Sequence, residues 1–186
     1  MRKIHLNALR LEQLIQNLLH LSRLEVNLPT VDIKPVRLFE NVQTAINLQR
    51  DAMDKMQVTV SQDIPTDILI RMELRDLELI LNNLISNAVK YNKIGGSITI
   101  RYLTYPKPVL CIEDTGLGIP EELLPRIFER FFRTDSARAE QEGTGLGLAI
   151  VKHAALKYGM TLRAESTLNV GSRFYIDIPN TILEQG

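Results

Sequence analysis

The sequence predicts an α+β domain built as a two-layer sandwich, with one mixed sheet and helices on one of its faces, preceded by one long helix. Short β-like runs come in neighbouring pairs with helical stretches between the pairs, whereas a doubly wound parallel sheet needs stricter alternation. The chain has 186 residues, of which 45% are hydrophobic and 24% are charged, so it is long enough to bury the core of one domain with a short appendage.

The appendage is an N-terminal helix over residues 1–26, a stretch without Gly or Pro. Its apolar residues recur at spacings of three, four and seven, as in a heptad repeat: Ile4, Leu11, Leu14, Leu18 and Leu21. This pattern favours a coiled coil or bundle with partner helices, and packing on the chain's own domain is the alternative. Pro29 ends the helix, which divides the chain into domains at residues 1–28 and 29–186.

The rest of the chain switches between strand and helix periods. Residues 114–142 have no sustained period and contain two Gly and two Pro. The other expected elements are an edge strand at 31–38, a helix at 39–55, strands at 58–60 and 68–70, a helix at 74–91, strands at 97–103 and 109–112, a helix at 146–158, and closing strands at 161–166 and 173–178.

Composition excludes several classes of protein. Lys and Arg together number 22, as do Asp and Glu, so the formal net charge is zero and we expect no nucleic-acid partner. Cys111 is the one cysteine, which excludes an intramolecular disulfide and a cysteine-based zinc site. The sequence has no run of about 18 apolar residues that could cross a membrane, and its first residues are not a secretory signal.

Polar side chains interrupt the apolar face of the helix expected at 74–91. Asn83, Asn87 and Lys90 stand at i, i+4 and i+7, which places two amides and an ammonium on one stripe. Asparagine is a mediocre helix former, and a neutral oxygen ligand suits Mg²⁺ that is bound together with a phosphate. The alternative for these residues alone is a solvated polar face.

Two glycine-bearing segments follow. Asp114 ends an apolar strand, where its carboxylate could accept a hydrogen bond from an exocyclic amine while the glycines behind it admit a ligand; a simple turn is the alternative. Residues 143–150 read Gly-Thr-Gly-Leu-Gly-Leu-Ala-Ile and lead into a helix whose first backbone amides could bind an anion. They are neither a P-loop, which ends in Gly-Lys-Ser/Thr, nor a Rossmann turn, which directly follows a strand.

A charged stretch with three phenylalanines, residues 126–138, lies between these two segments. Its glycine-bearing flanks and its aromatic residues favour a lid, from which Arg130 or Arg133 could reach a terminal phosphate. An ordinary surface helix is the alternative.

The four segments in this order resemble the N, G1, F and G2 boxes of bacterial two-component sensor histidine kinases. Their residues read Asn-Ala-Val-Lys-Tyr at 87–91, Asp-x-Gly-x-Gly at 114–118, Ile-Phe-Glu-Arg-Phe-Phe-Arg at 127–133 and Gly-Thr-Gly-Leu-Gly-Leu at 143–148. The resemblance covers residues 31–179, and residues 14–25 resemble the end of the second helix of that family's dimerisation hairpin. It implies the Bergerat-type ATP-binding sandwich, which gyrase B shares, with ATP and Mg²⁺ as cofactors.

The resemblance also implies a role for each matching residue. Asn87 would coordinate Mg²⁺ with support from Asn83, and the catalytic residues would be Asn87, Lys90, Arg130 and Arg133, of which the two arginines serve the γ-phosphate. The nucleotide contacts would be Lys90 and Tyr91 at the phosphates and ribose, Asp114 with Gly116, Gly118, Ile119 and Ser172 at adenine, and Gly143, Thr144, Gly145, Leu146, Gly147 and Leu148 at the phosphates.

Two departures bear on function. Asn83 stands where the hydrolysing members of the superfamily carry a glutamate as general base, and an amide cannot take a proton at neutral pH. None of His5, His20 and His153 matches the family's phosphoacceptor motif, so we expect a fragment whose acceptor histidine lies elsewhere.

We therefore expect the ATP-binding catalytic domain of a protein-histidine kinase, which transfers the γ-phosphate of ATP to a histidine missing from this chain. The phosphate would pass to the receiver domain of a response regulator, and the intact protein would form a homodimer through the N-terminal helix. The expected location is the cytoplasmic portion of an inner-membrane sensor protein. A regulatory nucleotide-binding module that docks on a partner protein is the alternative, and Asn83 argues against a hydrolysing ATPase.

Overall fold

The computed structural model describes Ile15, residues 32–133 and residues 144–185. Its helices and strands in chain order are β1 (Lys34–Arg37), α2 (Leu38–Leu48), α3 (Arg50–Met56), β2 (Thr59–Asp63), β3 (Ile68–Met72), α4 (Leu74–Lys90), β4 (Ser97–Leu103), β5 (Val109–Asp114), the 3-10 helix η1 (Glu121–Arg126), α6 (Gly147–Lys157), β6 (Thr161–Thr167), β7 (Gly171–Asp177), the 3-10 helix η2 (Asn180–Ile182) and β8 (Leu183–Gln185).

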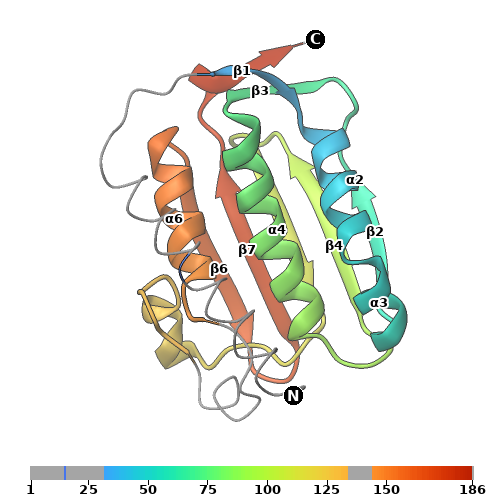
Figure 1. Cartoon of the computed structure of the whole chain (residues 1–186). Helices are drawn as coiled ribbons and strands as arrows, with labels where there is room; N and C mark the ends of the chain where they lie inside the picture. The colour runs from blue at the N-terminus through green and yellow to red at the C-terminus, as the bar shows by residue number, and fades with distance from the viewer. Residues whose placement is uncertain (1–14, 16–31, 134–143, 186) are drawn as a thin grey trace.

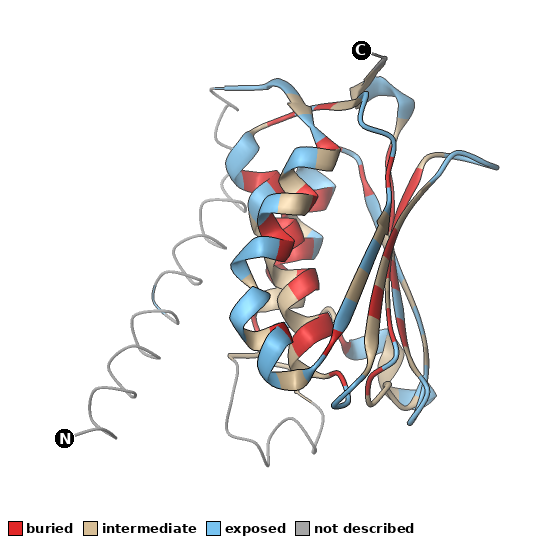
Figure 2. Ribbon diagram, turned by 90° about the vertical axis from the view of Figure 1, so that its right-hand side faces the viewer, coloured by how far each residue is buried: buried red, intermediate tan, exposed pale blue. Residues whose placement is uncertain are grey.

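The elements form two layers, as expected. A five-stranded sheet has the order β2-β4-β5-β7-β6, with β2 and β4 parallel and the other neighbours antiparallel. The helices α2, α4 and α6 lie side by side on one face of this sheet and leave its other face open (Figure 1; Figure 2). The predicted α+β sandwich with a mixed sheet and helices on one face is therefore confirmed. The expected N-terminal helix and the boundary after residue 28 lie outside the described residues, apart from the helical, exposed Ile15.

A second, smaller sheet corrects the expectation of one sheet. The strands β1 and β3 pair antiparallel with each other, and β8 pairs with the free side of β3, so that these three strands cap one end of the sandwich (Figure 1). The strand β8 was not expected, because three residues are too few for a readable alternation. Which distant strands pair depends on tertiary contacts, and local sequence patterns do not determine it.

The helix expected at 39–55 is two helices. Gln49 has φ −99° and ψ 3°, outside the helical region, and separates α2 from α3. Neither Gly nor Pro marks this break, and the apolar period runs through it, so the sequence pattern conceals it.

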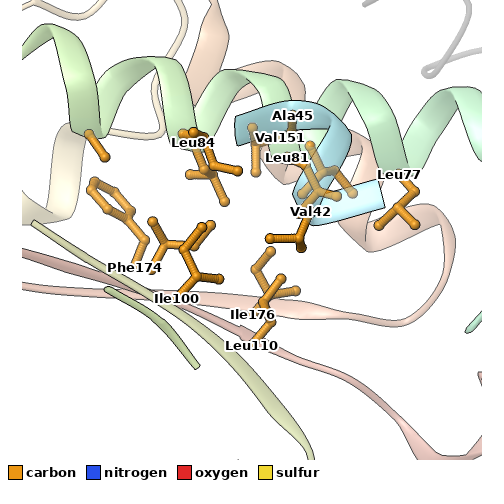
Figure 3. Close-up of a cluster of buried hydrophobic side chains, with 14 of the residues drawn as sticks. Val42, Ala45, Leu77, Leu81, Leu84, Ile100, Leu110, Val151, Phe174 and Ile176 are labelled. Atoms are coloured by element: carbon orange, nitrogen blue, oxygen red, sulfur yellow. The ribbon is translucent and has the colours of Figure 1, made fainter. Parts of the chain in front are cut away.

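The core lies between the helix layer and the sheet. One stripe of α4 turns its apolar side chains inward, including Leu77, Leu81 and Leu84, each at most 3% exposed. Alternate residues of the central strands, such as Ile100 and Ile176, meet them from the sheet (Figure 3). The stripe of α4 that borders this apolar stripe, and the ends of the central strands, are thereby left to polar residues.

Candidate functional site

Asn83 stands where α6 begins to pack on α4. Its side-chain amide donates a hydrogen bond to the carbonyl oxygen of Leu79 (2.8 Å). A Cβ added to Gly147, the first residue of α6, would lie 2.7 Å from Asn83 Oδ1, so only a glycine lets the two helices approach here without displacing the amide. The start of α6 is thus held directly against the polar stripe of α4.

Asn87 lies one helical turn beyond Asn83 and is half-buried. Within the described part of the chain, its side chain makes no hydrogen bond that would occupy the amide oxygen. Lys90 and Tyr91 follow at the helix end, where the Lys90 ammonium lies 5.1 Å from the centre of the Tyr91 ring. The expected stripe of two amides and one ammonium is therefore present on one helix.

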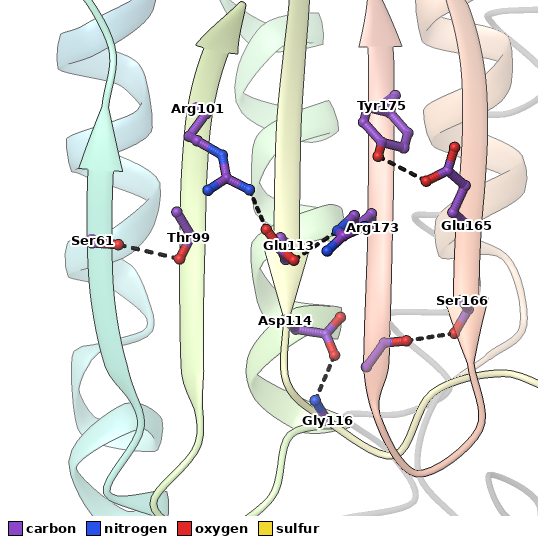
Figure 4. A network of polar contacts seen from close by, with 11 residues as sticks. Ser61, Thr99, Arg101, Glu113, Asp114, Gly116, Glu165, Ser166, Arg173 and Tyr175 are labelled. Atoms are coloured by element: carbon purple, nitrogen blue, oxygen red, sulfur yellow. Dashed lines mark hydrogen bonds and ion pairs between the residues drawn. The ribbon is translucent and has the colours of Figure 1, made fainter.

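Asp114 ends the central strand β5 and is 7% exposed. Its Oδ1 accepts a hydrogen bond from the backbone amide of Gly116 at 2.8 Å (Figure 4). Burial raises the pKa of Asp114 to about 6, although the backbone amides of Gly116 and Ser172 favour the charged form. A buried carboxylate with remaining acceptor capacity suits the recognition of a hydrogen-bond donor on a ligand.

The loop after Asp114 is fixed to the end of α4. Leu117 donates its backbone N–H to the carbonyl oxygen of Tyr91 (2.9 Å), and a Cβ on Gly116 would come within 2.1 Å of that same oxygen. Gly118 has φ +67°, and a Cβ there would lie 2.0 Å from the carbonyl oxygen of Thr167. Both glycines are required by close backbone approach, and they bring Asp114 next to the polar end of α4.

Two serines lie beside Asp114 in the sheet. Ser172 pairs with Asp114 in the β5–β7 register and is 7% exposed, and its Oγ is 3.0 Å from Ser166 Oγ. Ser166 gives its proton to the carbonyl oxygen of Gly171 (2.9 Å), so Ser172 is the donor between the two hydroxyls. Ser166 also accepts the Ile119 backbone N–H (2.7 Å). Sequence reasoning missed Ser166, because its partner across the sheet is visible only once the strand register is known.

The expected lid contacts the start of the glycine-bearing segment that leads into α6. Phe131 donates its backbone N–H to the carbonyl oxygen of Gly145 (2.9 Å), and Gly145 has φ +71°. Phe128 packs edge-on against Phe174 of the sheet, with ring centres 6.5 Å apart. Gly143 and residues 134–138 of the expected lid lie outside the described residues.

The Arg130 side chain is exposed, and its guanidinium contacts His153 of α6. Its Nη2 is 3.4 Å from His153 Nε2, and His153 Nδ1 donates to the carbonyl oxygen of Ala149 (2.8 Å). A neutral His153 therefore presents Nε2 as an acceptor to the guanidinium. Sequence reasoning treated His153 as an ordinary helix residue, whereas the structure places it beside Arg130, which is expected to serve the γ-phosphate. Arg133, three residues further on, is half-buried.

The remaining predicted residues are Thr144, Leu146 and Leu148 at the start of α6, and Ile119 in the loop after Asp114. Thr144 accepts the Leu146 backbone N–H on its hydroxyl (3.2 Å). Leu146 is 0% exposed and packs with Ala149 and Ile150, so its side chain belongs to the core and only its backbone could meet a ligand. Leu148 and Ile119 are partly buried against the main core. The structure thus brings the predicted residues of α4, the Asp114 loop and the start of α6 to one end of the sandwich.

Comparison with known proteins agrees with this geometry. A family model described as "Histidine kinase-, DNA gyrase B-, and HSP90-like ATPase" matches residues 72–182. The chain is 36% identical over 172 residues to the sensor-like histidine kinase SenX3 of Mycolicibacterium smegmatis, covering 91% of this chain and 45% of that protein. It is 34% identical over 176 residues to the phosphate regulon sensor protein PhoR of Pseudomonas aeruginosa, covering 94% and 40%. The solved structure of the mycobacterial sensor histidine kinase MprB matches with a TM-score of 0.69 and 28% identity, over 80% of this chain and 97% of that one.

The chain belongs to the family of histidine kinase-, gyrase B- and HSP90-like ATPases. Within this family it is a catalytic ATP-binding domain of the sensor histidine kinase type. The chain spans less than half the length of the curated relatives SenX3 and PhoR.

Proposed function

We propose that this chain binds ATP with Mg²⁺ and transfers the γ-phosphate to a histidine of a dimerisation domain, from which it passes to an aspartate of a response regulator. The observation that carries the proposal is the buried Asp114 carboxylate, held on the same end of the sandwich as Asn83 and Asn87. The relatives SenX3 and PhoR are named as sensor proteins of this class, which supports the same function.

The adenine end is assigned to the Asp114 loop. Asp114 accepts the exocyclic amino group, and the loop is kept in place by Tyr91 of α4 and by the β6–β7 turn. Ser172 lies beside the carboxylate across the β5–β7 pair. The glycines at 116 and 118 keep side chains out of the space that a planar base needs.

The residues at the phosphate end fit Mg²⁺. Asn87 offers an amide oxygen without a side-chain hydrogen bond in the described part of the chain, and this is a hard neutral ligand of the kind Mg²⁺ accepts. Among the described residues, no group of three or more His, Cys, Asp and Glu could hold a metal. We therefore assign Asn87 as the protein ligand, with ATP phosphates as the others. When bound, Mg²⁺ neutralises phosphate charge.

The chain's own residues bind and orient ATP rather than activate water. An imidazole nitrogen of the acceptor histidine forms the new P–N bond while the bond from the γ-phosphorus to the bridging oxygen breaks and ADP leaves. Lys90, Arg130 and Arg133 supply positive charge to the phosphates. Asn83 cannot serve as a base for water, which favours transfer over hydrolysis. Intact amides and the buried Asp114 argue against a purely regulatory module.

The intact protein is proposed to form a homodimer through the helix at residues 1–26 and to be the cytoplasmic portion of a membrane-anchored sensor. The heptad spacing of that segment supports the dimer. Within the described residues, no helix has the length and apolar character needed to span a membrane.

The test combines binding and transfer in one sample. Calorimetry measures ATP and ADP affinity with Mg²⁺ and after its removal by a chelator, and labelled ATP then reports phosphate transfer to a separately supplied dimerisation hairpin. We expect binding with transfer. Asn87→Ala should lose the Mg²⁺-dependent part of ATP affinity and the transfer, with unfolding unchanged, because it removes only the metal ligand. Binding without transfer would favour the regulatory module, and no binding would overturn the proposal.

A further inference from the structure

A polar cluster that the proposed function does not use joins the start of α4 to the end of α6. We call its four residues, Glu73, Asp76, Lys157 and Tyr158, the Asp76 cluster. Asp76 is 3% exposed, and its Oδ2 accepts hydrogen bonds from the Tyr158 hydroxyl (2.7 Å) and the Lys157 ammonium (2.8 Å). Lys157 also donates to Glu73 Oε1 (3.2 Å), and the Glu73 backbone amide donates to the Tyr158 hydroxyl oxygen (3.2 Å). The bonds form a closed set across the two helices.

Lys157 and Tyr158, the two donors of the cluster, keep their protons at neutral pH. Burial alone would lower the pKa of the Lys157 ammonium, but its hydrogen bonds to Asp76 and Glu73 raise that pKa above the ordinary value. Burial and the bond to Asp76 raise the pKa of the Tyr158 hydroxyl to about 12. Tyr158 and Lys157 therefore remain donors over the physiological pH range.

At the opposite end of α6 lies the glycine-bearing turn at residues 144–147, which the family resemblance assigns to the phosphates and which we call the phosphate-binding turn. There Gly147 meets Asn83 of α4, and Leu146 packs with Ala149, Ile150 and Leu79. The two helices run antiparallel, since the start of α6 meets the middle of α4 and the end of α6 meets its beginning. The Asp76 cluster and the Asn83 contact therefore hold α6 at its two ends.

The buried surface of α6 between these ends is apolar. Ala149, Ala154 and Ala155 are each 0% exposed, and Ile150 and Val151 are at most 1% exposed. Apolar contacts are non-directional, so this packing does not by itself impose a direction-specific constraint on the position of α6 along α4. Hydrogen bonds are directional, and a buried bond to a charged group is costly to break.

We propose that the Asp76 cluster is a positioning site that fixes α6 along α4, and thereby sets the separation between the phosphate-binding turn and the amides of Asn83 and Asn87. Support of this kind matters because small displacements of binding groups cost affinity and rate. The adenine end depends instead on Tyr91 and the β6–β7 turn, which do not belong to α6. The inference rests on the proposed function, since it assigns the two amides to the phosphate end.

The substitution Tyr158→Phe tests it. The ring and its contact with Lys157, at 5.3 Å, are retained, while the two bonds of the hydroxyl are lost. We expect ATP affinity to fall by about tenfold and adenosine affinity by less than about twofold, because only the phosphate end moves. Calorimetry with both ligands on the full chain measures this ratio, which a general loss of stability would not change.

Tyr175→Phe is the matched control. Tyr175 also donates its hydroxyl to a carboxylate, Glu165 Oε2 at 2.9 Å, but on the open face of the sheet away from α6 (Figure 4). Tyr175→Phe should leave the affinities for ATP and for adenosine unchanged. A second variant, Asp76→Asn, keeps an acceptor for the Tyr158 hydroxyl but removes the charge facing Lys157. It should change the ratio of ATP to adenosine affinity in the same direction. This variant provides the test if Tyr158→Phe does not fold.

One result would overturn the inference while leaving the proposed function intact. This is an unchanged ratio of ATP to adenosine affinity in a folded variant, whether both affinities fall equally or neither falls. If the unaltered chain binds adenosine but shows no additional affinity for ATP with Mg²⁺, the proposed function itself fails. The two failures are therefore distinguished by the unaltered protein.

Discussion

Asp114 is a carboxylate in an environment that penalises its charge. Its pKa of about 6 in the folded protein lies above the ordinary value of 3.8, and burial is the main cause. Folding therefore favours the protonated form, so the contribution of Asp114 to stability is fully present below about pH 4 and is lost as the pH rises through 6. The ionised form is the stronger hydrogen-bond acceptor for an adenine amino group.

Adenosine affinity should consequently depend on pH. Between pH 7 and pH 5 we expect a loss of roughly tenfold, since the ionised fraction of a group with this pKa falls by about that factor. Adenosine is the ligand of choice because it carries no phosphate that titrates in this range. Calorimetric titrations at several pH values measure the effect, and Asp114→Asn should bind more weakly and lose the pH dependence. A variant that retained the same slope would contradict the assignment.

For single residues, the sequence predicts the site where a reactive side chain stands at a recognisable place in an element, such as the end of an apolar strand. Asp114 directly follows an apolar strand and precedes two glycines, so its burial in a ligand-admitting loop could be anticipated. Leu146 lies within an equally clear motif, yet its side chain belongs to the core. Ser166 was missed because its pairing with Ser172 depends on the register of the β6–β7 hairpin. His153 was missed because Arg130 comes from a segment that only the tertiary structure brings close.

Among the elements, α4 carries two neighbouring stripes with different roles. One stripe supplies Leu77, Leu81 and Leu84 to the core, and the other carries Asn83 and Asn87. A helix packed this way cannot rotate without exposing leucines and burying amides, which costs free energy in both directions. The core thereby holds the amides in a fixed orientation.

Removing one core leucine of α4 should be costly. Leu81 is 0% exposed, so Leu81→Ala should lower the free energy of unfolding by about 2–5 kcal/mol through lost burial and the cavity left behind. The matched control is Leu48→Ala on α2, where the leucine is 65% exposed and the expected change is within about 0.5 kcal/mol. Urea unfolding of the two variants gives both values, and equal effects would refute the assigned burial.

Element boundaries show what local patterns can and cannot predict. The strand expected at 97–103 is β4, residue for residue, because it alternates, follows Gly95 and Gly96 and precedes Pro106. The break at Gln49 and the strand β8 carry no such signal. Which strands pair, and hence the presence of two sheets, depends on contacts between distant segments.

For the whole molecule, acidic and basic side chains on the open face of the five-stranded sheet pair with one another. Glu113 lies between Arg101 and Arg173 and is bonded to both, with Arg173 Nε 2.7 Å from Glu113 Oε1 (Figure 4). Asp177 pairs with Lys107 (2.6 Å) and Arg163 (3.3 Å). Because the negative charges on this face are paired with positive ones, the face attracts a charged partner only weakly. We therefore expect docking partners to approach the helix side or the nucleotide end.

The helix expected at residues 1–26 should mediate self-association of the chain. Replacing Leu14 and Leu18 by Ala should weaken dimerisation by at least roughly 100-fold, because heptad leucines supply the apolar contact between helices. Sedimentation over a range of concentrations measures the dissociation constant, with Leu48→Ala as a control outside the heptad segment. A chain that is monomeric both before and after the change would rule out the predicted bundle.

The pairing of β5 with β7 also has a kinetic consequence. The hairpins β4–β5 and β6–β7 join neighbouring segments, whereas β5 and β7 come from distant parts of the chain, and it is their pairing that sets Asp114 beside Ser172. Distant pairings carry a larger loop-closure cost and form late. The adenine pocket is therefore completed near the end of folding, so a nucleotide should slow unfolding while leaving the refolding rate nearly unchanged.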